Sequence, residues 1–157
     1  MVNERAIGYA LGLWLWWQSR LAGAAVLDSD MAVLDPPGGY SAKVLAFARA
    51  VARAEGFGVA GAVPTRLNNP GDLKASSVAS IGRDASGHLQ FANLVDGWTA
   101  LYRQVQLIID GHSRNYTLDM TINEMAAKYA ESNVHWARNV AGALNVPAST
   151  RLREILL

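Results

Sequence analysis

Glu55 is the residue of this chain whose type and position best suit acid catalysis. It directly precedes Gly56, at the end of a segment whose apolar side chains recur at helical spacing, and it falls on the apolar face. Burial and the negative end of a helix dipole both disfavour an ionised carboxylate, so both raise its pKa. A carboxylic acid that keeps its proton near neutral pH can protonate a leaving sugar oxygen in a glycosidase. Alternatively, the side chain of Glu55 turns into solvent at a frayed helix end.

A loop rich in turn residues follows Glu55. Residues 68–72 read Asn-Asn-Pro-Gly-Asp. Pro70 fixes φ, Gly71 permits a positive φ, and the side chains of Asn68 and Asn69 can bond to nearby backbone. We therefore expect a tight turn with a positive φ at Gly71, and a turn former is also the plain alternative for any binding role of the two asparagines.

The elements that must position these residues are mainly helices. The spacing of apolar residues predicts a helix over residues 41–55 and another from about Asp96 to Gly111. Thr121 and Glu124 form a capping box that starts a third helix. Trp136, Val140 and Leu144 mark a fourth, and residues 150–157 can add a short one. Residues 86–91 suggest a small hairpin with Gly82 and Gly87 at its turns.

The order of these motifs resembles a known family. It comprises Ala54-Glu55-Gly56, residues 64–73 (Pro-Thr-Arg-Leu-Asn-Asn-Pro-Gly-Asp-Leu), Phe91, a helix containing Gly97-Trp98-Thr99-Ala100-Leu101, and closing segments at 120–130 and 136–140. This pattern is similar to the lytic transglycosylase-like domains of the lysozyme superfamily in bacteriophage virion and tail-associated proteins. The similarity spans about residues 41–157. It departs from the soluble transglycosylases, which have Ser after the catalytic Glu and a later Gly-Leu-Met-Gln motif, and Asp72 stands where the divergent group usually has Asn.

The resemblance implies a mainly α, lysozyme-like domain that cleaves the β-1,4 bond between N-acetylmuramic acid and N-acetylglucosamine in peptidoglycan. Glu55 would be the general acid, and in a lytic transglycosylase it would then take the proton of the muramyl 6-hydroxyl. A hydrolase needs a second carboxylate. The candidates for that second carboxylate are Asp72, Glu124 and Glu131.

The resemblance also suggests which residues bind the glycan. Asn68, Asn69, Asp72 and Tyr129 are the candidates for the sugar groove, and the alternative for Tyr129 is a core aromatic. The rival functional interpretation is a non-catalytic virion protein that keeps a lysozyme-like shape for assembly or glycan binding.

Composition limits the other possible functions. The chain has 157 residues, of which 51% are hydrophobic and 17% charged, and its net charge is +1. Such a chain can bury one core, and it has no basic surface for nucleic acid. It has no cysteine, and His88, His112 and His135 lack metal-ligand spacing, so we expect no metal, no other cofactor, and solvated or locally bonded histidines.

The N-terminus is a separate unit. Residues 6–26 are mostly apolar and long enough to cross a bilayer as a helix, although Arg20 is costly there. The segment can instead dock on other virion proteins through Trp14, Trp16 and Trp17, or serve as a signal peptide. We therefore expect a hydrophobic anchor or docking helix and linker in residues 1–35 and a catalytic domain in residues 36–157. The protein would be virion-associated and act in the periplasm of the bacterial envelope, with residues 6–26 as its membrane anchor or docking helix.

Overall fold

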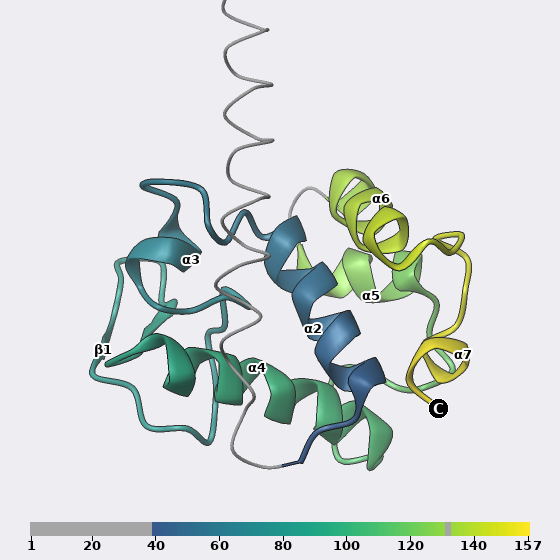
Figure 1. The fold of residues 1–157 in the computed structure, drawn as a ribbon, viewed down its shortest axis with the longest axis horizontal. Coiled ribbons are helices and arrows are strands. Elements are labelled where there is room, and N and C mark those ends of the chain that lie inside the picture. Colours follow the sequence, from purple (N-terminus) through teal and green to yellow (C-terminus); the bar gives the residue numbers. More distant parts are fainter. Residues whose placement is uncertain (1–38, 131–132) are drawn as a thin grey trace, which may run out of the picture.

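The computed structural model describes residues 39–130 and 133–157, and these residues are mainly helical (Figure 1). The helices are α2 (Ala42–Ala54), α3 (Val63–Arg66), α4 (Leu94–Ile109), α5 (Ile122–Tyr129), α6 (Asn133–Leu144) and α7 (Leu152–Leu156), and the strands are β1 (Gly82–Arg83) and β2 (Leu89–Gln90). The predicted anchor or docking helix at residues 6–26 lies outside the described residues. Within the described ranges, no helix combines the length and apolar character needed to cross a membrane.

Helix α2 is the centre of the fold and carries Glu55 at its end. The Ser41 hydroxyl accepts a hydrogen bond from the Val44 amide at 3.3 Å and so caps the first turn. The buried face of α2 packs against α4, α6 and α7, and Figure 1 shows α2 crossing the middle of the molecule. Glu55 is the C-cap, and Gly56 follows with φ +80°. The helix predicted over residues 41–55 is therefore confirmed.

The other predicted helices are also present. Helix α4 begins after Asn93, whose side chain accepts from the Asp96 amide at 3.0 Å, and Gly111 follows its end with φ +70°. The capping box of Thr121 and Glu124 starts α5. Helix α5 packs on α6, and α6 packs on α2. These helices share one hydrophobic core and form the helical half of the molecule.

The segments between α2 and α4, which we call the loop-rich half of the molecule, have their own small core. The hairpin pairs Gly82 with Gln90 and Arg83 with Leu89, and its turn contains Gly87 with φ +86°. The expectation that Gly82 lies in a turn is wrong, because Gly82 is paired in β1. The buried hydrophobic residues that form this core are Leu73, Leu89, Phe91 and Ala100. Because Ala100 belongs to α4, that helix is shared between the two halves.

The loop at residues 68–72 is held against α4 by close backbone contact. A Cβ atom on Gly97 would lie 1.8 Å from the carbonyl oxygen of Asn68, so only glycine allows this approach. The expectation of a positive φ at Gly71 is wrong, since positive φ occurs at Asn68 (51°) and Asp72 (49°) instead. Asn and Asp tolerate this region better than other side-chain-bearing residues. Gly71 is constrained by space, because an added Cβ would lie 2.8 Å from Leu101 Cδ1.

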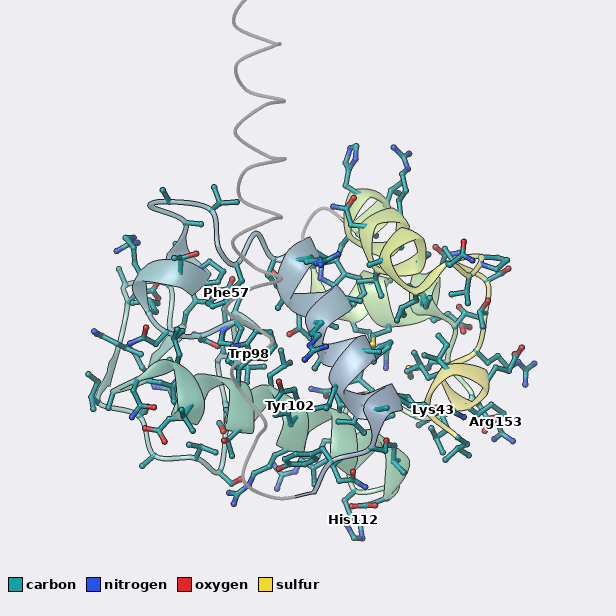
Figure 2. All side chains as sticks on the ribbon, viewed as in Figure 1. Lys43, Phe57, Trp98, Tyr102, His112 and Arg153 are labelled. Carbon is teal, nitrogen blue, oxygen red and sulfur yellow. The ribbon has the colours of Figure 1, made fainter. Side chains whose placement is uncertain are left out.

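A row of aromatic rings connects the segment after α2 to α4. Phe57 meets Trp98 edge-on at a centroid distance of 5.5 Å, and Trp98 stacks on Tyr102 at 5.6 Å. Figure 2 shows these three labelled side chains following one another across the molecule. The row fixes the chain just after Glu55 and so helps to hold that residue in place.

Candidate active site

A cavity of about 750 Å³ lies between the helical half and the loop-rich half. Its walls come from α2, α4, α5 and α6 and from the segments around residues 72–75, 86–88 and 115–116. This volume is within the usual range for small-molecule sites, which is roughly 300–1,000 Å³. The polar and aromatic side chains of the lining include Glu55, Asp72, Lys74, His88, Gln104, Asn115, Tyr116, Lys128, Tyr129, His135, Trp136 and Asn139.

Glu55 lines this cavity and is partly buried. Its Oε1 accepts a hydrogen bond of 2.6 Å from Trp136 Nε1. Burial raises the pKa of Glu55 to about 7, and the negative charge of Asp72 acts in the same direction. The hydrogen bond from Trp136 and the proximity of His88 lower the pKa, but burial outweighs them. Glu55 can therefore hold a transferable proton near neutral pH.

Trp136 is itself fixed by Tyr129. The two rings stack at a centroid distance of 5.0 Å, and the Tyr129 hydroxyl donates a 2.5 Å hydrogen bond to the Gly71 carbonyl. Burial keeps the pKa of Tyr129 well above its ordinary value, so this hydroxyl remains a donor. Trp136 therefore links Tyr129 to Glu55 at the wall of the cavity. Sequence reasoning assigned Trp136 only to a helix, because no local pattern relates it to a residue 81 positions away.

A second group of ionisable side chains centres on His88, which lines the cavity together with Asp72. Its Nδ1 lies 2.9 Å from Asp84 Oδ2, and its Nε2 lies 3.3 Å from Asp72 Oδ2. Burial raises the pKa of Asp72 while His88 opposes that shift, and the hydrogen bonds from His88 lower the pKa of Asp84. The expected local bond of a histidine is present here, but its second contact, to Asp72, was not foreseen. Across residues 39–130 and 133–157, no group of three His, Asp or Glu side chains is arranged to hold a metal ion.

Asn68 and Asn69 do not line this cavity. Asn69 is completely buried, its Oδ1 accepts from the Leu73 amide, and its Nδ2 donates to the carbonyls of Leu73 and Leu89, each at 2.9 Å. Asn68 Nδ2 donates to the Phe91 carbonyl at 3.2 Å. This differs from our prediction of two groove-lining amides. Both side chains hold the loop against the hairpin, and that loop places Asp72.

The three candidates for a second carboxylate are separated by the structure. Glu124 is exposed and accepts from the Thr121 amide at 2.8 Å in the capping box, outside the cavity lining. Glu131 lies outside the described residues. Asp72 shares the cavity with Glu55, and among the described lining residues these two are the carboxylates.

Comparison of the chain with models of protein families, with curated proteins and with solved structures gives no match. The structural basis for a function therefore lies in the residues of the cavity. These offer one proton donor at Glu55, a second carboxylate at Asp72, and aromatic and amide groups suited to a polar organic ligand.

Proposed function

We propose that this chain is a peptidoglycan-cleaving glycosidase with a lysozyme-like helical fold. Its substrate would be the β-1,4 bond between N-acetylmuramic acid and N-acetylglucosamine. The observation that carries this proposal is the state of Glu55, a carboxyl group with a pKa of about 7 that lines a ligand-sized cavity. Glycoside cleavage requires such a group, because the leaving sugar oxygen must gain a proton as its bond to C1 breaks.

The first step would be proton transfer from Glu55 to the glycosidic oxygen. Trp136 Nε1 donates to Oε1 of Glu55, which supports a defined direction for the carboxyl group. In the transglycosylase route, the Glu55 carboxylate then takes the proton of the muramyl 6-hydroxyl, which closes a 1,6-anhydro ring. In the hydrolytic route, a second group takes a proton from water.

The remaining lining suits an N-acetylated sugar. Asn115 and Asn139 offer amide donors and acceptors, and Tyr116 offers an aromatic side chain. Ligand sites commonly combine an apolar and aromatic wall with a few polar groups that fix orientation. The hydroxyl and acetamido groups around the edge of such a sugar ring, and the axial C–H groups on its faces, match this kind of lining.

A virion-associated enzyme would act on the cell wall in the periplasm, and residues 6–26 would attach it to a membrane or to other virion proteins. The apolar length and the three tryptophans of that segment support an attachment role.

Replacement of Glu55 by Gln tests the proposal. The amide keeps the shape and can still accept from Trp136, but it has no proton of suitable acidity. We expect release of soluble fragments from purified peptidoglycan to fall by about 10²–10⁴-fold, the usual contribution of a general acid. Asp110→Asn is the matched control, since Asp110 is exposed and outside the main cavity. Equal release by wild type and Glu55→Gln would favour the non-catalytic virion protein instead.

A further inference from the structure

Asp72 meets the cavity through one oxygen. Its side chain is 22% exposed, whereas Oδ1 is buried and without a hydrogen-bond partner among the described residues. A water molecule in the cavity can therefore reach only Oδ2. That oxygen is also the one that lies 3.3 Å from His88 Nε2.

The imidazole of His88 is oriented from its other side. Asp84 accepts from the His88 amide at 2.8 Å through Oδ1, and its Oδ2 lies 2.9 Å from Nδ1. A carboxylate on Nδ1 keeps a proton on that nitrogen and leaves Nε2 to face Asp72. One additional proton can then be held between Asp72 Oδ2 and His88 Nε2, as Asp72 O–H donating to Nε2 or as Nε2–H donating to the carboxylate.

From this arrangement we infer that the Asp72–His88 pair is the general base of the reaction and that water is the acceptor, which makes the chain a hydrolase. This inference rests on the proposed function and decides its second step. Asp72 is the catalytic residue of the pair because its Oδ2 would touch the water, and His88 and Asp84 are positioning residues. Glu55 and Asp72 then supply the two carboxyl groups that glycoside hydrolysis uses.

Glu55 loses its proton to the glycosidic oxygen as the bond from that oxygen to C1 breaks. The oxygen of water bonds to C1, and the proton it releases passes to Oδ2 of Asp72 and is held against His88. The pair then returns a proton to Glu55 through solvent. Because water attacks the face opposite the leaving group, the new reducing end has inverted configuration.

The products distinguish this inference from the transglycosylase route. Fragments released from purified peptidoglycan by the full chain are treated with borohydride and analysed by mass spectrometry. We expect free muramyl ends, which are one water heavier than 1,6-anhydro ends and are reduced by borohydride. Anhydro ends would overturn the inference and leave the proposed function standing. An absence of any cleavage by wild type would overturn the proposed function, and this inference with it.

Asp72→Asn tests the base itself. Asn tolerates the φ of +49° at this position and preserves the shape of the side chain, so the fold should persist. We expect cleavage to fall by about 10²-fold or more. Sodium azide needs no deprotonation to attack C1, and it should restore cleavage by Asp72→Asn with formation of a glycosyl azide. It should not restore Glu55→Gln, which lacks the acid. A wild-type rate for Asp72→Asn, or a low rate that azide leaves unchanged, would overturn the assignment.

His88→Gln separates positioning from a structural role. The variant leaves Asp72 in place but removes the ring that holds its proton, so we expect a loss of about tenfold. Azide should restore this loss as well, because it bypasses the base. Loss that azide does not restore would mean that His88 supports only the fold.

Discussion

Trp136 donates a 2.6 Å hydrogen bond through Nε1 to Oε1 of Glu55 and thereby links α6 to the end of α2. Burial raises the pKa of this carboxyl group, and the indole hydrogen bond limits the rise. The same Trp136 stacks on Tyr129, whose hydroxyl bonds to the loop that holds Asp72. Glu55 and the loop are therefore positioned by one chain of contacts.

Trp136→Phe should separate orientation from acidity. Phe keeps a ring to stack on Tyr129 but cannot donate to Glu55. A hydrogen bond to an ionised carboxylate is worth about 1.5–3 kcal/mol, so we expect the pKa of Glu55 to rise further and the rate to fall by about tenfold. The pH dependence of peptidoglycan cleavage would measure both changes. If cleavage by Trp136→Phe fell at the same high pH as cleavage by wild type, the role of this hydrogen bond would be contradicted.

Activity should fall as pH rises through about 7, because Glu55 must carry a proton to act as the acid. The pH dependence of kcat/KM on a soluble glycan fragment would report the pKa of the free enzyme. A fall in kcat/KM near pH 4.5, the ordinary pKa of a Glu side chain, would mean that Glu55 is not desolvated in solution.

The same raised pKa of Glu55 predicts that stability also falls as pH rises. The unfolded chain loses the Glu55 proton near pH 4.5 and the folded chain near pH 7, so stability falls between these values and the loss is complete above them. Glu55→Gln escapes this cost and should be more stable than wild type above neutral pH, by about 1–3 kcal/mol. Urea denaturation below pH 4.5 and above pH 7 measures the difference. An equal difference at both values would contradict the prediction.

Gly97→Ala should destabilise the fold by about 1–3 kcal/mol or more, because the added methyl group would overlap the backbone of Asn68. Gly142→Ala is the matched control. Gly142 lies in α6 with open space around its Cβ position, so alanine should add up to about 1 kcal/mol there through helix propensity. Thermal unfolding of the two variants should move the melting temperature in opposite directions. A similar change in both would exclude the close contact.

Gly71→Val should lower both stability and activity for a steric reason. Its branched side chain would meet Leu101 and Leu73 and would displace the carbonyl that accepts from Tyr129. We expect a loss of about 1–3 kcal/mol, with a smaller loss for Gly71→Ala. An unchanged melting temperature for Gly71→Val would contradict this.

Deletion of residues 1–35 tests the proposed attachment. We expect the shortened chain to cleave isolated peptidoglycan like the full chain but no longer to sediment with membranes or assembled particles. The basis is the long apolar run of residues 6–26, whose apolar surface is larger than a soluble monomer normally exposes to water. If the shortened chain unfolds, or if the full chain is a monomer without detergent, the segment belongs to the folded core.

The helices and the position of Glu55 at the end of one of them follow from the sequence. Apolar residues three and four positions apart define buried faces, and Ser41, Thr121 with Glu124, and Gly111 bound the helices through local hydrogen bonds and positive φ. These features act over a few residues, so they can be read from the chain itself. The φ of Gly71 was mispredicted because Asn68 and Asp72 took the positive values in the same turn.

The site was decided only by tertiary structure. The hydrogen-bond partner of Glu55 lies on α6, and His88, which contacts Asp72, lies in the hairpin turn. The burial that raises the pKa of Glu55 depends on the packing of other segments around the cavity. Asn69 was expected in the sugar groove, but its amide bonds to the backbone of Leu73 in the turn and to the Leu89 carbonyl in the hairpin. His88 has the expected local bond, to Asp84, and it also lines the cavity beside Asp72. Hydrogen bonding and desolvation depend on which atoms meet in space, and neither has a fixed spacing along the sequence.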